Sequence, residues 1–230
     1  MRIITMNKSN MYEFISKTWN PLGGECSHKC SFCYVTKMKQ RFPVMERKYS
    51  GEPFIDNRQM NAKFKPGDTV FVCSCNDLFA DNVPPAMIIK ILEHCENYPE
   101  TTFYFQSKNI DKMYKMKSYF PEDSIICTTA ETNRWYMGIM GGLSVMDRLY
   151  WLRKMYFRTE ITIEPIMDFD LYTFIELLKN SGASKINIGA NSDKSIKLPE
   201  PTEEKILQLI SELKKFTVVY QKSNLQRLVK

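Results

Sequence analysis

The sequence contains no run approaching the roughly 18 consecutive apolar residues of a membrane-spanning helix, which excludes such a helix and any membrane partner. After Met1 there is no apolar core followed by small residues, so no secretory signal is predicted and we expect a cytoplasmic protein. No segment of about 20 to 50 residues repeats, which excludes a solenoid. These absences leave an ordinary globular chain as the class to consider.

The seven cysteines are an odd number, and the chain of 230 residues is long enough to bury a core without disulfides. Both facts argue against a secreted disulfide framework and favour reduced thiols or a metal site. Hydrophobic residues make up 43% and charged residues 25% of the chain, which is typical of soluble globular proteins.

The net charge of +6 is unevenly distributed. Residues 37–65 contain eight Lys or Arg and three Asp or Glu, a net charge of +5, and a second basic cluster lies at residues 108–117. Such segments can follow a phosphate backbone, or they can form a solvated loop and a polar helix face. The sequence leaves both interpretations open.

Short apolar runs alternate with amphipathic stretches along the chain. Several runs are almost uninterrupted, as expected of parallel strands that are covered on both faces. The predicted strands are Phe14 to Trp19, Thr69 to Cys75, Thr102 to Gln106, Ser124 to Thr129, Glu160 to Glu164, Lys185 to Gly189 and Thr217 to Tyr220.

Helices are predicted between these strands from their boundary signals. Proline at early positions and Ser, Thr or Asp at the N-cap mark helix starts. The predicted helices are Ala86 to Cys95, Leu171 to Asn180, a helix capped by Thr202 that runs to Leu213, and a helix from Ser144 or Asp147 to about Phe157.

The alternation of strands and helices predicts an α/β fold. A closed eight-unit barrel needs about 250 residues, and residues 35–68 look irregular. We therefore expect a single domain over residues 1–230, an open partial (βα)6-type barrel of parallel strands with an additional C-terminal strand and an irregular basic insertion at about 35–68. A doubly wound sheet is the alternative, because periodicity does not define strand order. In either fold, functional groups lie beyond the C-terminal ends of the strands.

Three cysteines, Cys26, Cys30 and Cys33, follow the first predicted strand in the spacing C-x3-C-x2-C. One loop can therefore wrap a single inorganic centre, with Gly23-Gly24 allowing close backbone approach. Four-iron clusters normally take four Cys thiolates, so three leave one iron open to a ligand. Catalytic zinc also keeps an open position.

This motif, with the aromatic Phe32 before its last cysteine, resembles that of the radical SAM superfamily. The resemblance implies that Cys26, Cys30 and Cys33 bind a [4Fe-4S] cluster, that S-adenosylmethionine (SAM) chelates the fourth iron, and that Phe32 or Tyr34 lies near the adenine. It also implies an electron donor of the flavodoxin or ferredoxin type. One electron from the cluster would cleave SAM to methionine and a 5′-deoxyadenosyl radical, which abstracts hydrogen from a substrate.

The resemblance extends over most of the chain. Trp19-Asn20-Pro21, Cys75-Asn76-Asp77-Leu78-Phe79 and Ile163-Glu164-Pro165 are similar to a group of small, phage-associated radical SAM proteins, itself distantly similar to spore photoproduct lyase, a DNA repair enzyme. The Gly-Gly-Glu tripeptide that many radical SAM proteins use for the SAM amino group is missing. Ser74, Asn76 and Asp77 occupy its place, and the positional matches for contacts to the ribose and carboxylate are Thr129, Glu131, Glu164 and Asn187.

The cysteines outside the motif are weighed separately. Cys75, at the predicted barrel mouth, is a candidate hydrogen donor that quenches a product radical. Cys73 and Cys75 are two apart on the predicted strand, so we expect their side chains to share a face. With Cys95 and Cys127 these make four thiols, but they are scattered, and we expect small buried hydrophobes rather than a second cluster.

The resulting hypothesis is a radical SAM enzyme that acts on a nucleic acid or nucleotide. A peptide or small metabolite is the next most favoured substrate class. The alternatives are a zinc-stabilised nucleic-acid-binding module and an electron carrier that does not use SAM. A zinc site that includes His28 is disfavoured, because ligands at positions 26, 28 and 30 would crowd a tetrahedron. An electron carrier would more naturally bring a fourth cysteine close to the other three.

Overall fold

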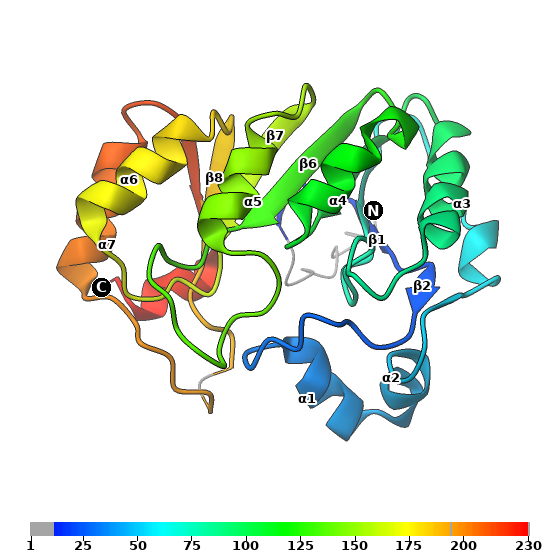
Figure 1. Ribbon diagram of the computed structural model, residues 1–230, viewed down its shortest axis with the longest axis horizontal. Coiled ribbons are helices and arrows are strands. Elements are labelled where there is room, and N and C mark those ends of the chain that lie inside the picture. The colour runs from blue at the N-terminus through cyan, green and yellow to red at the C-terminus, as the bar shows by residue number, and fades with distance from the viewer. Residues whose placement is uncertain (1–11, 194, 230) are drawn as a thin grey trace, which may run out of the picture.

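A computed structural model describes residues 12–193 and 195–229 and shows a seven-stranded parallel sheet (Figure 1). Its strands pair in the order in which they occur along the chain, whereas a doubly wound sheet reverses that order at a switch point. The fold is therefore the open partial barrel that the sequence predicts. The strands are β1 (Lys17–Trp19), β4 (Thr69–Val72), β5 (Thr102–Gln106), β6 (Ser124–Thr129), β7 (Arg158–Ile163), β8 (Lys185–Ile188) and β9 (Val218–Gln221).

Five helices follow individual strands of this sheet and cover one of its faces. They are α3 (Pro85–Glu96), α4 (Ile110–Lys115), α5 (Val145–Leu152), α6 (Leu171–Asn180) and α7 (Glu203–Leu213), with short 3₁₀ segments η1 (Gln59–Asn61), η2 (Lys117–Tyr119) and η3 (Ser223–Arg227). None of the helices in the described part of the chain is long and apolar enough to cross a bilayer.

The predicted helix caps are confirmed at two helices. The Ser144 hydroxyl accepts a hydrogen bond from the Asp147 N–H at 3.1 Å, and the Thr202 hydroxyl accepts one from the Lys205 N–H at 3.4 Å. The helix that begins after Ser144 ends at Leu152, so its predicted extension to about Phe157 is wrong. The six-residue α4, which we did not predict, is too short to show a clear hydrophobic period.

The two faces of the sheet bury different sets of side chains. Phe103 and Phe105 of β5 pack in the main core with the helices, while Tyr104 between them joins a smaller cluster on the opposite face. This alternation is the period of two of a β-strand. Tyr12 and Ile15 from the N-terminal segment belong to the smaller cluster, so that segment covers the face that lacks helices.

The insertion at about 35–68 is more ordered than we predicted. It contains most of α1 (Tyr34–Arg41), all of α2 (Pro43–Lys48), and the strand β3 (Phe54–Ile55), which pairs antiparallel with β2 (Leu22–Gly23). The two helices were not predicted because together they bury only one residue, and so lack the apolar stripe of a packed helix. Figure 1 shows both beside the segment that carries the cysteine motif.

The second strand ends earlier than predicted, at Val72. Cys73 then adopts a left-handed conformation with φ of 59°, so the expectation that Cys73 and Cys75 share a strand face is wrong. Cys73, Cys95 and Cys127 are buried, in agreement with their interpretation as small hydrophobes, and Cys75 is partly exposed.

Candidate active site

The cysteine loop, residues 24–33, runs from β2 to α1 and is tied down at both ends. At its start, the Gly24 N–H donates to the Lys48 carbonyl at 2.8 Å, and a Cβ on Gly24 would lie 2.5 Å from the Glu52 carbonyl oxygen. With φ of 92°, this position requires glycine. At its end, Cys33 is the N-cap of α1. The loop therefore presents three free, partly exposed cysteines on a supported backbone.

The Cys26 thiol lies near the Asp77 carboxylate and near the backbone N–H groups of His28 and Asp77. Burial, and then the negative charge of Asp77, raise the pKa of the Cys26 thiol to about 12, while the two N–H groups lower it. A bound cation reverses this balance, since a coordinating thiol is deprotonated outright. Three free thiols in one loop fit a group bound by thiolates.

Within residues 12–193 and 195–229, no three His, Cys, Asp or Glu side chains are gathered closely enough to hold a metal ion. The ligation of iron by the three cysteines therefore stays a prediction.

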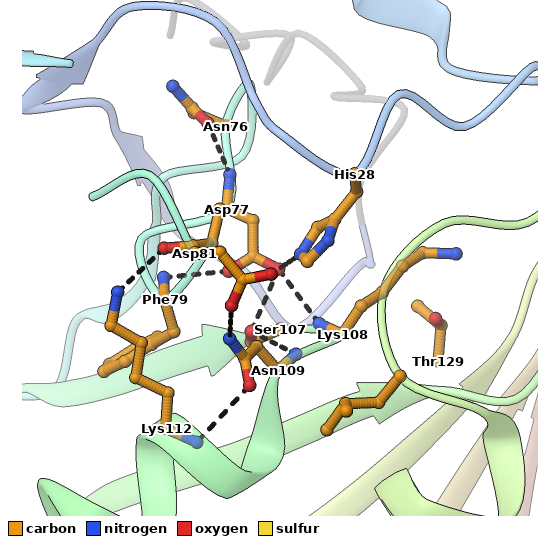
Figure 2. Close-up of polar contacts among 12 residues, drawn as sticks. His28, Asn76, Asp77, Phe79, Asp81, Ser107, Lys108, Asn109, Lys112 and Thr129 are labelled. Atoms are coloured by element: carbon orange, nitrogen blue, oxygen red, sulfur yellow. Dashed lines mark hydrogen bonds and ion pairs between the residues drawn. The ribbon is translucent and has the colours of Figure 1, made fainter. Parts of the chain in front are cut away.

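His28 extends from the middle of the cysteine loop into the protein and meets Asp77, just after β4 (Figure 2). Its Nε2 lies 2.7 Å from Asp77 Oδ2, which also accepts hydrogen bonds from the Ser107 hydroxyl and the Lys108 N–H, both at 2.9 Å. Asp77 Oδ1 accepts from the Phe79 N–H at 2.9 Å. Burial raises the pKa of the Asp77 carboxyl, but these partners outweigh it, so its pKa lies below the usual range.

Behind Asp77, Glu131 is completely buried between two cations. Lys108 Nζ binds Glu131 Oε1, and Arg148 Nη1 lies 3.0 Å from Glu131 Oε2. Arg148 also donates to the Thr129 hydroxyl at 2.8 Å, and Lys108 Nζ lies 5.0 Å from the centre of the Phe32 ring. A continuous polar network thus joins the cysteine loop to the ends of β5 and β6.

The segment after β4 completes this side of the site. Ser74 donates to Asn20 Oδ1 at 3.2 Å, and the Asn76 amide donates to the Gly24 carbonyl at 2.8 Å. The Tyr34 hydroxyl donates to the Ser74 carbonyl at 2.5 Å and lies 3.7 Å from Cys75 Sγ. Eight of the predicted site residues other than the three cysteines are therefore found in the cysteine loop or close to it: Phe32, Tyr34, Ser74, Cys75, Asn76, Asp77, Thr129 and Glu131.

The other two predicted residues lie further along the sheet, at β7 and β8. Glu164 binds Lys222 Nζ at 2.6 Å and the Asn224 amide at 2.7 Å. Asn187, within β8, donates to Glu160 at 3.2 Å, and its buried Oδ1 has no partner among the described residues. The structure does not place either of them in contact with the cysteine-loop network.

A second loop, residues 132–144, packs on the cysteine loop. The Ser31 N–H donates to the Ile139 carbonyl at 3.1 Å. Arg134 pairs with Asp168 and Asp170, which attaches the loop to the segment before α6. A Cβ on Gly141 would lie 1.7 Å from the His28 carbonyl oxygen. The two loops therefore touch through backbone, without room for a side chain.

Replacing Gly141 with Ala should force these loops apart, because the added methyl group meets backbone rather than a movable side chain. We expect faster alkylation of the loop cysteines and a loss of stability of about 1–3 kcal/mol. Gly138→Ala is the matched control in the same loop. It meets nothing within 4 Å and only strains a backbone with φ of 72°. Equal alkylation rates in the two variants would contradict this packing.

Residues 9–173 match the family described as "Protein of unknown function (DUF5131)". The chain belongs to this family. No protein of curated function matches it.

Solved structures of similar fold include those of two other proteins. A mutant of spore photoproduct lyase with bound AdoMet and dinucleoside spore photoproduct has a TM-score of 0.61 at 10% identity, covering 89% of this chain and 75% of that one. SuiB of Streptococcus suis bound to its precursor peptide SuiA has a TM-score of 0.53 at 10% identity, covering 93% of this chain and 50% of that one. At these identities the comparisons show a shared fold, and it is the fold of proteins that have been solved with bound AdoMet or S-adenosylmethionine.

Residue pattern alone did not reveal three parts of this site. His28 was weighed only as a zinc ligand, whereas it binds Asp77. Lys108 was considered only as one of a basic cluster. Arg148, whose side chain is 1% exposed, was not singled out. Nothing local distinguishes a buried arginine from an exposed one on a short helix.

Proposed function

We propose that this chain is a radical SAM enzyme, with Cys26, Cys30 and Cys33 binding a [4Fe-4S] cluster and SAM bound at the open iron. The observation that supports this best is the position of the three free thiols. They lie in one loop, after the first strand of an open parallel barrel, in a fold shared with SuiB, which has been solved with S-adenosylmethionine at a TM-score of 0.51. When bound, the cluster supplies the electron that cleaves SAM to a 5′-deoxyadenosyl radical, which abstracts hydrogen from the substrate.

The chain's own residues would bind and orient SAM. Phe32 and Tyr34 flank Cys33 and offer aromatic surface for the adenine, while Ser74, Asn76 and Asp77 lie beside the cysteine loop for the amino group. We assign the ribose and carboxylate contacts to Thr129, Glu131, Glu164 and Asn187. Asn187 has the strongest support, because its buried Oδ1 has no partner among the described residues and can accept a bond from a ribose hydroxyl.

For the substrate, we favour a nucleic acid or nucleotide. The basic insertion supports this choice because Lys37, Arg41 and Arg47 lie on α1 and α2, immediately after the cysteine loop. A dinucleoside ligand in one protein of the same fold is consistent with it, whereas the SuiA peptide in the other makes a peptide substrate the competing outcome. An electron donor of the flavodoxin or ferredoxin type would supply the electron.

Cys75 is the proposed hydrogen donor to a product radical. Its thiol is partly exposed, lies next to the cysteine loop and is 3.7 Å from the Tyr34 hydroxyl. In Cys75→Ala we expect release of 5′-deoxyadenosine within about twofold of the wild-type rate, because none of the three cluster ligands changes. The substrate-derived product should instead shift from the form that has received a hydrogen atom to oxidised species, as measured by mass spectrometry. An unchanged product distribution would remove Cys75 from the mechanism.

The deciding experiment is anaerobic reconstitution with iron and sulfide, followed by dithionite and SAM. Release of 5′-deoxyadenosine supports the proposal. Tight zinc binding without SAM cleavage would instead support a nucleic-acid-binding module. A stable cluster that does not cleave SAM would support an electron carrier. Adding oligonucleotides and peptides in separate reactions, and measuring deuterium transfer into 5′-deoxyadenosine from deuterated substrate, would then distinguish the two substrate classes.

A further inference from the structure

The middle of the cysteine loop is held by a side chain that is not a predicted ligand. Only 5% of the His28 side chain is exposed, although the residue lies between two cysteines that are partly exposed. Its Nε2 lies 2.7 Å from Asp77 Oδ2. We propose that His28 is a positioning residue: by binding Asp77, its imidazole holds the cysteine loop, and Cys26 with it, against the segment that follows β4.

The partner of His28 is itself rigidly held. Asp77 accepts hydrogen bonds from Ser107, Lys108 and Phe79, so its carboxylate is oriented from β5 and from its own turn as well as by His28 (Figure 2). A side chain that is held by several hydrogen bonds in turn fixes the position of the group that it binds. The loop is thereby anchored to the end of the neighbouring strand rather than only to its own flanks.

The opposite side of the imidazole is closed by glycines. A Cβ on Gly142 would lie 3.0 Å from His28 Nδ1, and one on Gly141 would overlap the His28 carbonyl oxygen. The ring is thus enclosed between Asp77 and the loop of residues 132–144. This enclosure leaves the imidazole no space for the tetrahedral arrangement with Cys26 and Cys30 that a zinc site would need.

The consequence for Cys26 follows from its place in the loop. Cys26 lies two residues before His28, and its thiol lies near Asp77, the residue that His28 binds. The side-chain bond therefore fixes where the Cys26 sulfur lies relative to Asp77. The charge and solvent exposure around a cluster help to set the reduction potential of an iron–sulfur centre. This inference rests on the proposed function for its redox consequence, but its geometric part holds for the protein without a cluster.

The test compares His28→Ala with His28→Gln. A glutamine amide nitrogen reaches about the position of imidazole Nε2 and can donate to Asp77, whereas alanine cannot. In the cluster-free protein, we expect N-ethylmaleimide to modify Cys26 about tenfold faster in His28→Ala, because the loop opens locally, and near the wild-type rate in His28→Gln. After reconstitution, the reduced cluster of His28→Ala should show an altered electron paramagnetic resonance spectrum and a shifted reduction potential, with both restored by glutamine.

His94→Ala is the matched control, because His94 is the other histidine of the chain. It packs on Trp19 and lies 3.1 Å from the Ala62 carbonyl, away from the cysteine loop. It should lower the thermal midpoint without changing Cys26 modification or the cluster spectrum. Wild-type modification rates in His28→Ala, failure of glutamine to restore them, or the same acceleration in His94→Ala would each overturn the proposal.

The two proposals can fail separately. Alkylation of the cluster-free chain needs neither iron nor SAM, so it decides the role of His28 even if the wild-type protein assembles no cluster. Conversely, a wild-type protein that cleaves SAM while His28→Ala behaves normally would retain the proposed function and reject the positioning role.

Discussion

Cys30→Ala should abolish both the visible absorbance of the reconstituted cluster and the release of 5′-deoxyadenosine. Cys30 is the middle ligand of the proposed set, and its loss leaves two thiolates, too few to retain a four-iron centre that already lacks a fourth protein ligand. We expect the chain itself to fold, since Cys30 is partly exposed and belongs to neither hydrophobic core. The visible absorbance of the cluster, the iron content and product chromatography would measure the outcome.

Cys95→Ala is the control for this prediction. Cys95 is free and fully buried on α3, in the core between helices and sheet. Removing its sulfur should cost about 1 kcal/mol of stability through a small cavity and leave the cluster intact. SAM cleavage that survives in Cys30→Ala, or disappears equally in Cys95→Ala, would contradict the assignment of the three ligands.

Glu131→Ala should produce the largest loss of stability. The Glu131 side chain is 0% exposed and faces Arg148, which is 1% exposed, and Lys108, which is 11% exposed. Removing the carboxylate leaves two cations without their counter-charge in the interior, at a cost of about 3–5 kcal/mol. Urea unfolding of the cluster-free protein measures this directly.

The matched control is Glu212→Ala, which removes a surface pair with Lys215. Because both partners are exposed, the change in the free energy of unfolding should stay within about 0.5 kcal/mol. A similar cost for both substitutions would mean that the buried network contributes nothing beyond an ordinary ion pair.

The carboxyl group of Glu131 also makes the free energy of unfolding depend on pH. Burial alone raises the pKa of its carboxyl, but the charges of Lys108 and Arg148 outweigh burial, so the pKa lies well below its ordinary value of 4.5. A group whose pKa is depressed on folding stabilises the protein above the unfolded pKa, and this contribution is lost as the pH falls toward the folded pKa. Stability should therefore decline below about pH 4.5, and Glu131→Gln should flatten that decline.

Individual strands and helices show how much of the fold the sequence predicted. The strands Thr102–Gln106 and Ser124–Thr129 and the helix Leu171–Asn180 were predicted at their observed bounds, because strong apolar patterning marks each of them. The helices α1 and α2 were missed, since they bury almost nothing. The assignment of Cys73 to a strand was wrong, because one left-handed residue ended that strand without a glycine to signal it.

Sequence by itself determined the alternation of strands and helices, the three-thiol loop after the first strand, and the resemblance to radical SAM proteins. These features depend on patterning and spacing within short segments, which the chain carries locally. Tertiary structure alone decided the order of the strands, the burial of Glu131 between Lys108 and Arg148, and the contact of His28 with Asp77, 49 residues further along the chain. Such contacts arise when the ends of neighbouring parallel strands meet, and no periodicity within a single segment encodes which side chains will face one another there.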